Sequence, residues 1–301
     1  MFTRIDRLQV DMPIPKDPDP KAAAAIQELM GGRFGEMSTL MNYLFQSYNF
    51  RNKAKLRPFY SLISNIATEE LGHVELIAAA VNGCLNGQEP QGEMAEKGDA
   101  SMAHLLDMPL MNHHIMFGQG AMPTDSRGTG WNGDYVFNSG NLILDLLHNF
   151  FLENGARTAK LRVYQMTDNP AARQMLGYLF TRGGVHARAY ALALEKLTGV
   201  KMSQMLPIPK IEDIVLPEST PYMADGWHRK VYRFSDKDYT GIEQIWHGPH
   251  PDGTGDLIIV DGPPEGGDMN DYEGISEAFT PEYTAEEIFE IAQKLYQKAT
   301  D

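Results

Sequence analysis

The sequence predicts an all-α core, a four-helix bundle with one long crossover, from three observations. Long segments with apolar residues at helical spacing fill most of residues 1–200. Turn residues divide these segments into two hairpins, with turns near Asn52 and Asn169. Between the hairpins, residues 88–136 are rich in glycine, proline and methionine, which is typical of a long connection.

The first hairpin is predicted from a helix between Asp19 and about Asn49 and a second helix between about Pro58 and Asn82. Asp19 can cap the first helix, and the Pro20 that follows fits the first helical position. The polar segment RNKAKLRP forms the turn, and an Asn-Gly pair closes the second helix.

The second hairpin is predicted from residues 140–166 and from a helix between Asn169 and about Leu197. The earlier segment is apolar almost all round, which indicates a buried helix. Asn169 supplies the N-cap before Pro170, and Gly199 ends the last helix.

The rest of the chain predicts an extended, mostly irregular C-terminal tail. Residues 202–283 are rich in proline and glycine and contain few periodic segments. Trp227 and Trp246 favour packing over disorder, and we expect that packing to involve neighbouring subunits. A final amphipathic helix is expected to begin at Thr284, which forms a capping box with Glu287.

Two helical hairpins joined by one long crossover have the connectivity of a ferritin-like four-helix bundle. We therefore expect residues 1–200 to form such a bundle, with a metal site in its core. Residues 201–301 are expected to form an extension that packs on the bundle and on neighbouring subunits. In di-metal bundles of this kind, ligands from the facing helices converge at one level.

Candidate ligands do lie at one level. Glu70 and His73 are three residues apart in an apolar segment, so they share a helix face and can bind one cation. Glu36 precedes the first turn by ~16 residues and Glu70 follows it by ~18, which places both roughly 24–27 Å from that turn. Glu153 and His186 lie ~16 and ~17 residues from the second turn, at the same height.

The three carboxylates stand among apolar neighbours in the sequence. Burial without compensation would cost several kcal/mol for each, so a bound cation is the simplest explanation. Each residue alone has another interpretation. Glu36 could be solvated beside the nearby glycines, Glu153 could pair with Arg157, and His186 could be a hydrogen-bonded core histidine.

The other histidines lack a matching carboxylate frame and are interpreted as structural or surface residues: His104, His113, His114, His148, His228, His247 and His250. Two further motifs are weak. The DGTGD segment at 252–256 is too short for an EF-hand and predicts a turn. The glycines at 31–35 lack a preceding strand, so they are no dinucleotide-binding motif.

Composition narrows the function classes. The net charge of −14, without a basic cluster, argues against binding to nucleic acid or to an anionic membrane surface. The lone Cys84 excludes an intrachain disulfide framework and fits a reducing compartment, so we expect a cytoplasmic protein. The N-terminus has charges and prolines where a signal peptide needs an apolar run, and no segment approaches ~20 apolar residues.

The ligand set resembles that of the manganese catalases, the non-haem dimanganese catalases. The blocks NFFLENGARTAKLRVYQMTDNP and GYLFTRGGVHARAYALALEKLTGV are similar to that family, and the similarity covers essentially the whole chain. The resemblance implies two manganese ions per subunit and no haem, hydrogen peroxide as substrate, and a homohexamer. It also implies that Glu70 bridges the metals, that Glu36 and His73 complete one ion, and that Glu153 and His186 complete the other.

The sequence departs from the family pattern at two positions. Some members carry a non-ligand glutamate where this chain has Gly183, and an arginine where it has Leu152, so that acid–base pair is missing. Lys160, seven residues after Glu153 and on the same helix face, is the local substitute we expect to be catalytic. Tyr43, seven residues after Glu36, is expected to hydrogen-bond a ligand carboxylate.

Charge counting favours a two-electron site. Two divalent ions and three carboxylates sum to about +1 and two trivalent ions to about +3, which hydroxo and oxo bridges can neutralise. Such a centre suits disproportionation of hydrogen peroxide to water and dioxygen. Ligand type does not separate manganese from iron. The alternatives are therefore a ferritin-like di-iron oxidase, or a catalase-related spore-coat protein with a structural role.

Overall fold

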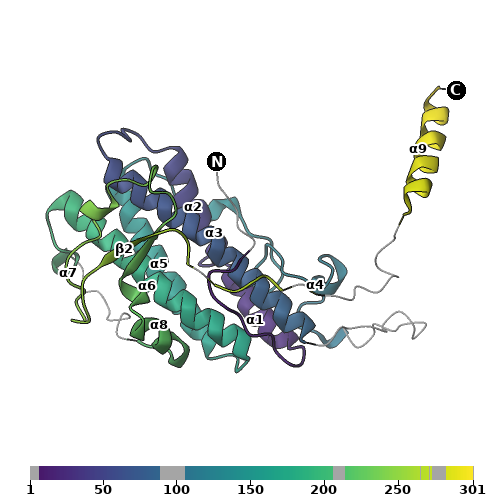
Figure 1. Cartoon of the computed structure of the whole chain (residues 1–301), viewed down its shortest axis with the longest axis horizontal. Coiled ribbons are helices and arrows are strands. Elements are labelled where there is room, and N and C mark those ends of the chain that lie inside the picture. The colour runs from purple at the N-terminus through teal and green to yellow at the C-terminus, as the bar shows by residue number, and fades with distance from the viewer. Residues whose placement is uncertain are drawn as a thin grey trace.

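The computed structural model describes residues 7–88, 106–205, 214–264, 266–270, 272 and 283–300. Its core consists of long helices that run side by side (Figure 1). These helices are α1 (Pro20–Gly31), α2 (Glu36–Tyr48), α3 (Arg57–Asn86), α5 (Leu142–Tyr164) and α6 (Pro170–Thr198). Helices α1 and α2 follow each other along one edge and together fill the place of one bundle helix, so the predicted four-helix bundle is confirmed.

The prediction of one continuous helix from Asp19 to Asn49 was wrong. The chain breaks between α1 and α2, at the glycines. A Cβ atom at Gly31 would lie 2.6 Å from the carbonyl carbon of Thr124, and one at Gly35 would lie 2.7 Å from the carbonyl oxygen of Leu29. Because the crossover and the first helix both press on the backbone there, only glycine fits. Glu36 consequently becomes the first residue of α2.

Helix α6 of the second hairpin begins and ends where the sequence predicts. Asn169 caps α6, since its Oδ1 accepts hydrogen bonds from the amides of Ala171 and Ala172 at 3.0 and 3.3 Å. Gly199 ends α6 in the left-handed conformation, with φ of +74°. A side-chain cap from Asn141 also starts α5.

The described part of the crossover runs over the outside of α1 and α2. It contains the short helices α4 (Asn112–Ile115) and η3 (Gly133–Tyr135). Gln27, fully buried on α1, donates hydrogen bonds to the carbonyl oxygens of Met122 and Thr124 and so fastens the crossover. The sequence also predicts a short helical piece near residues 99–107, which lies almost entirely outside the described residues.

The described tail residues up to 264 pack on the chain's own bundle, whereas residues 283–300 are exposed. Its elements are α7 (Met202–Met205), η5 (Pro217–Ser219), α8 (Thr220–Ala224), η6 (Trp227–Arg229), β1 (Lys230–Arg233), η7 (Ile242–Gln244) and β2 (Ile258–Asp261). Strands β1 and β2 pair in parallel. Trp246 is buried among bundle residues, and its Nε1 donates to the carbonyl oxygens of Arg229 and Ile258. The division at residue 200 stays a prediction.

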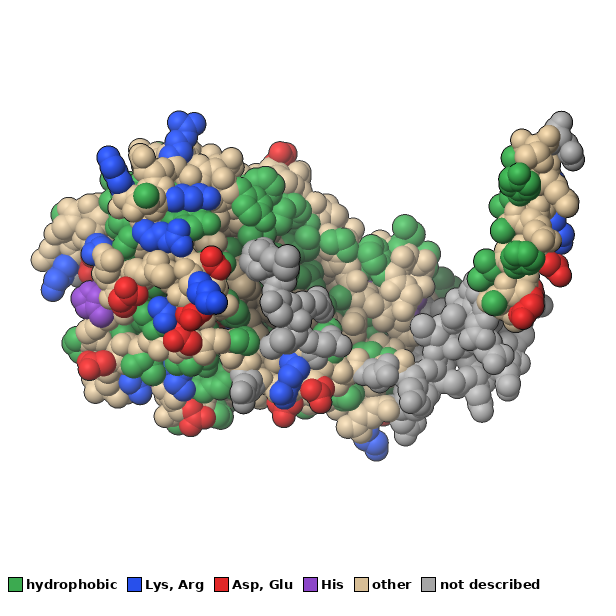
Figure 2. All heavy atoms as spheres, turned by 45° about the horizontal axis from the view of Figure 1, so that its top comes forward, with side chains coloured by type: hydrophobic (Ala, Val, Ile, Leu, Met, Phe, Trp, Pro, Cys, Tyr) green, Lys and Arg blue, Asp and Glu red, His purple; other side chains and the backbone are tan. Residues whose placement is uncertain are grey.

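The last helix, α9 (Ala285–Thr300), begins at the predicted capping box. The Thr284 amide donates to Glu287 Oε2 at 2.8 Å, and the Glu287 amide donates to Thr284 Oγ1 at 3.2 Å. Its apolar side chains are exposed, Phe289 and Leu295 by 63% each, and they gather on one side of the helix (Figure 2). Across the described residues, no helix combines the length and apolar character needed to cross a membrane.

Candidate metal centre

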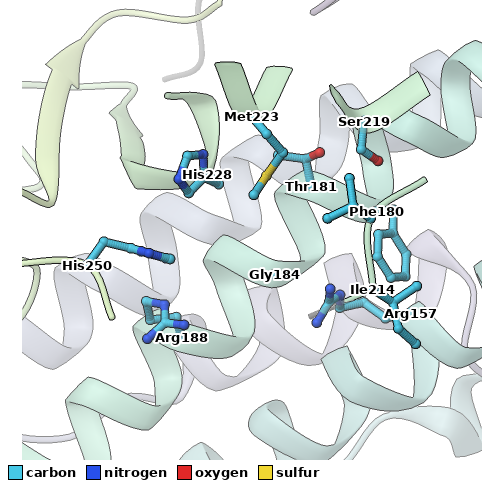
Figure 3. A pocket seen from close by; sticks show the side chains of 11 residues that line it. Arg157, Phe180, Thr181, Gly184, Arg188, Ile214, Ser219, Met223, His228 and His250 are labelled. Carbon is cyan, nitrogen blue, oxygen red and sulfur yellow. The ribbon is translucent and has the colours of Figure 1, made fainter. Parts of the chain in front are cut away.

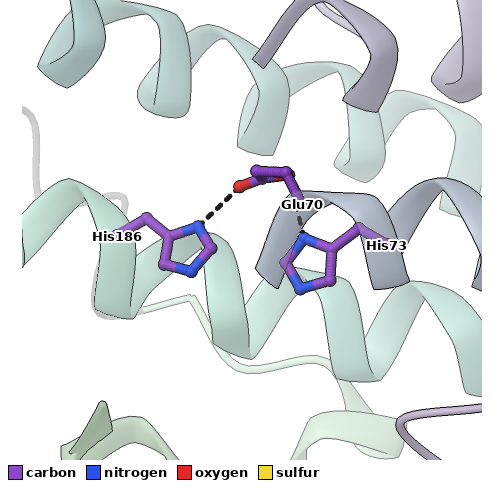
Figure 4. A group of neighbouring side chains, drawn as sticks. All are labelled: Glu70, His73 and His186. Carbon is purple, nitrogen blue, oxygen red and sulfur yellow. Dashed lines mark hydrogen bonds and ion pairs between the residues drawn. The ribbon is translucent and has the colours of Figure 1, made fainter. Parts of the chain in front are cut away.

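The five predicted ligands converge in the middle of the bundle. They come from α2, α3, α5 and α6, and each residue is at most 2% exposed. They are Glu36, Glu70, His73, Glu153 and His186. Glu70 lies between the two imidazoles (Figure 4). Its Oε2 is 3.0 Å from Nδ1 of His73, and its Oε1 is 2.7 Å from Nδ1 of His186. One carboxylate therefore faces two nitrogen donors, one with each oxygen.

Two further carboxylates, Glu36 and Glu153, each lie beside one of the two histidines, so the cluster has two halves. Glu36 Oε2 lies 3.8 Å from Nδ1 of His73, and Glu153 Oε1 lies 3.5 Å from Nδ1 of His186. Buried Glu70 Oε1 and His186 Nδ1 take part in no hydrogen bond, although they are close to each other. His73 Nδ1 and Glu70 Oε2, by contrast, form a hydrogen bond at 3.0 Å. Buried donor atoms that converge in this way, some of them without a hydrogen bond, fit a cation between them. The solvated interpretation of Glu36 was wrong.

Negative charge dominates the cluster. Burial alone would raise the pKa of the Glu36 carboxyl, but Lys160 and His73 outweigh it and hold that pKa below its usual range. Burial alone would lower the pKa of the His73 imidazole, yet Glu70, Glu36 and Glu69 raise it to about 10. In the metal-free protein, protons on the imidazoles thus supply positive charge that a bound cation would otherwise supply.

Glu69 is a member of the site that sequence reasoning missed. It is buried, with Oε1 3.7 Å from Nε2 of His73 and Oε2 3.2 Å from Nε2 of His186. Arg182 holds this carboxylate from behind, donating from Nε at 2.6 Å and from Nη2 at 3.1 Å. Glu69 therefore turns both rings so that Nδ1 points to Glu70. The sequence signal that could have identified Glu69 is its position four residues before His73, on the same helix face. Arg182 stands in the same relation to His186.

Three more side chains hold the carboxylates. Lys160 is 2% exposed, and its Nζ lies 2.5 Å from Glu36 Oε1. Tyr43 Oη donates to Glu153 Oε1 at 2.6 Å. Thr39, which the sequence analysis also missed, places Oγ1 3.1 Å from Glu36 Oε2 and 3.0 Å from Oε2 of Glu70. The sequence alone also allowed Lys160 to be an ordinary surface lysine, and its burial excludes that alternative.

Gly183 leaves room that a neighbour fills. A Cβ atom there would lie 3.0 Å from Arg157 Cγ and 3.7 Å from Glu153 Oε2. The Arg157 guanidinium stacks over the Phe180 ring, 4.3 Å from its centroid. The side chain of Arg157 thus occupies space beside the Glu153 carboxylate that a side chain at position 183 would otherwise enter.

A second group of donors lies outside this centre. Asp252 contacts two histidines, His228 Nε2 at 2.9 Å and His250 Nδ1 at 2.7 Å. The interpretation that these histidines have no matching carboxylate was therefore wrong for this pair. Asp252 accepts further hydrogen bonds from the amide and hydroxyl of Thr254, so the predicted DGTGD turn is present.

Comparison with known proteins identifies the family. The family model described as manganese-containing catalase matches residues 1–300. This chain belongs to the manganese catalase family. The family recognised from the sequence is thereby confirmed, and manganese is the metal of its centre.

Individual manganese catalases and a related protein are similar to this chain. The uncharacterized protein YjqC of Bacillus subtilis is 34% identical over 87% of this chain and 91% of its own length. A manganese catalase of Bacillus subtilis is 37% identical over 61% of this chain and 66% of its own length. The crystal structure of KatB, a manganese catalase from Anabaena, superposes with a TM-score of 0.54 at 23% identity, covering 78% of this chain and 92% of that one. The last similarity shows the ferritin-like fold alone.

Proposed function

We propose that the chain disproportionates hydrogen peroxide to water and dioxygen at two manganese ions per subunit. The ligands would be Glu36, Glu70, His73, Glu153 and His186. The observation that carries the proposal is the position of Glu70, whose two oxygens face Nδ1 of two different imidazoles at 3.0 and 2.7 Å. A carboxylate in this position can bridge two ions, and each half of the cluster then has one further glutamate.

When bound, the manganese pair supplies the redox chemistry of the reaction. The chain's own residues hold the centre and its protons. Glu69 fixes the imidazole orientation, and Tyr43 holds Glu153 through its hydroxyl. Burial alone would lower the pKa of the Lys160 ammonium, but Glu36 and Glu153 raise it, so Lys160 keeps a proton at Nζ beside Glu36. We assign Lys160 the role of proton donor to the peroxide oxygens.

The test is metal analysis combined with oxygen release. Protein expressed with manganese should contain about two manganese ions per chain, show no haem absorption band and release dioxygen from hydrogen peroxide. Two iron ions per chain and no dioxygen would contradict the proposal and favour the di-iron oxidase. Azide should inhibit the release, because a small anion competes for open metal positions.

We also propose that the protein is a cytoplasmic homohexamer with an extension after residue 200. Exposed apolar side chains on the bundle, among them Phe45, Tyr48 and Phe151, offer surface for subunit contacts. The apolar side of α9 offers more. Light scattering is expected to give the mass of six chains, and a monomer would contradict the assembly.

A further inference from the structure

A small pocket lies between α5, α6 and the tail segment 214–250. Its volume is ≈ 50 Å³. Since one water needs about 10–15 Å³ of such space, the pocket accommodates a few waters or one hydrogen peroxide molecule. Figure 3 shows its polar lining, with Arg157 on α5, Arg188 on α6, and His228 and His250 from the tail.

The inner wall of this pocket is thin on the side of the metal centre. Gly184 lines the pocket, and a Cβ atom there would lie 3.6 Å from Arg157 Cζ. The preceding Gly183 has Arg157 Cγ and Glu153 Oε2 within 3.0 and 3.7 Å of its own Cβ position. Consecutive glycines on α6 and the aliphatic part of Arg157 are therefore what separates the pocket from a proposed ligand carboxylate.

The outer wall is fixed by the second histidine group. His228 and His250 both line the pocket, and Asp252 holds both rings from behind at 2.9 and 2.7 Å. Phe180 and Met223 add apolar surface. A small pocket with nitrogen donors and apolar walls suits a small, neutral molecule that both donates and accepts hydrogen bonds. Hydrogen peroxide has those properties.

We propose that this pocket is the entrance through which peroxide reaches the metal centre, and that Arg157 at its inner end determines which molecules pass. The inference rests on the proposed function, because it needs metals beside Glu153. Arg157 is held by stacking on Phe180, so its side chain keeps a defined width at the passage. Molecules much bulkier than peroxide are excluded there by size.

Two substitutions at one position test the entrance. Gly184→Leu places a side chain in the pocket, whereas Gly184→Ala adds a single Cβ at ordinary contact distance and is the matched control. Alanine also favours the helix. We expect Gly184→Leu to lower kcat/KM for peroxide by about tenfold or more, because it slows diffusion of peroxide to the site, while Gly184→Ala stays within about twofold of the parent.

Two further readouts separate blocked entry from a damaged centre. The manganese content and the visible absorption of the oxidised centre should be unchanged in Gly184→Leu, while azide should associate with that centre more slowly. An unchanged kcat/KM and azide rate in a fully loaded Gly184→Leu protein would overturn the entrance. Absence of manganese from the parent protein would instead overturn the proposed function.

The role of Arg157 is tested with two neutral reductants of different size. Hydroxylamine is about as large as peroxide, and N-tert-butylhydroxylamine is much bulkier; both are followed by loss of the oxidised centre's absorption. We expect Arg157→Ala to raise the rate of the bulky reductant relative to the small one by about tenfold, because the passage widens. An unchanged ratio, with metal retained, would show that Arg157 does not determine passage.

Discussion

Two groups of histidines and carboxylates in the described part of the chain bring their donor atoms within 4.8 Å of one another. One, the core group, contains Glu70, His73 and His186. The other, the tail group, contains His228, His250 and Asp252. The core group is fully buried between bundle helices, whereas Asp252 in the tail group is exposed. By donor distance alone the two groups are equivalent.

The charged residues that surround the core group and the tail group differ in sign. Around the core group stand three more buried carboxylates, Glu36, Glu69 and Glu153. Burial alone would lower the pKa of the His73 imidazole, but Glu70, Glu36 and Glu69 raise it to about 10. Around the tail group, burial first and then nearby arginines, Arg188 among them, lower the pKa of both histidines despite Asp252. Converging donors suggest a metal site only where the surroundings also carry excess negative charge. We therefore propose that the core group, and not the tail group, holds the metals.

The largest expected effect comes from neutralising one carboxylate in each group. Glu70→Gln should abolish metal binding and oxygen release, because it removes the bridge between the two halves. Asp252→Asn, the same chemical change in the tail group, should keep both metals and should not abolish oxygen release. Metal analysis and circular dichroism of the two variants check this. Loss of manganese from Asp252→Asn would reverse the comparison.

The next effect concerns the residue behind the imidazoles. Glu69→Gln should weaken manganese binding by about 10- to 100-fold, since it releases both rings. It should also destabilise the fold by about 3–5 kcal/mol, because Arg182 stays buried without its carboxylate. In the double variant Glu69→Gln/Arg182→Met, stability should return while metal affinity stays low. Restored affinity in the double variant would show that Glu69 acts only on the fold.

A substitution of Lys160 should affect turnover without affecting metal binding. Lys160→Met should retain manganese and lower kcat by about 10²- to 10⁴-fold, the usual range for loss of a proton donor. Lys196→Met removes the same charge from an exposed position of α6 and serves as the control. Full activity in loaded Lys160→Met would end the proton-donor assignment.

The smallest expected effect is on stability as a function of pH. One histidine from each group should change that stability in opposite directions as pH rises. His73 has a raised pKa, so in the metal-free protein its stabilising contribution is complete below about pH 6.5 and is lost as pH rises toward about 10. His228 has a lowered pKa, so its contribution is present above about pH 6.5 and is lost as pH falls. Thermal unfolding of metal-free His73→Gln and His228→Gln proteins should show a weakened decline on the alkaline and acid sides respectively. The same profile for both variants would contradict the assignment.

The convergence of the five proposed ligands was predictable from the sequence because their positions follow helical periodicity. Glu70 and His73 share a face, and the two turns set the heights of the others without knowledge of packing. The break before Glu36 was not predictable in the same way, since the backbone of Thr124 in the distant crossover imposes it. Glu69 was missed because its role depends on Arg182 in another helix.

The central claim is that Glu70 bridges two manganese ions. Anomalous diffraction from crystals of the manganese-loaded protein, measured on both sides of the manganese absorption edge, tests it most directly. The account predicts two manganese peaks on either side of the Glu70 carboxylate, one beside Nδ1 of His73 and the other beside Nδ1 of His186. A single peak, or a manganese peak at Asp252 with none at Glu70, would contradict it.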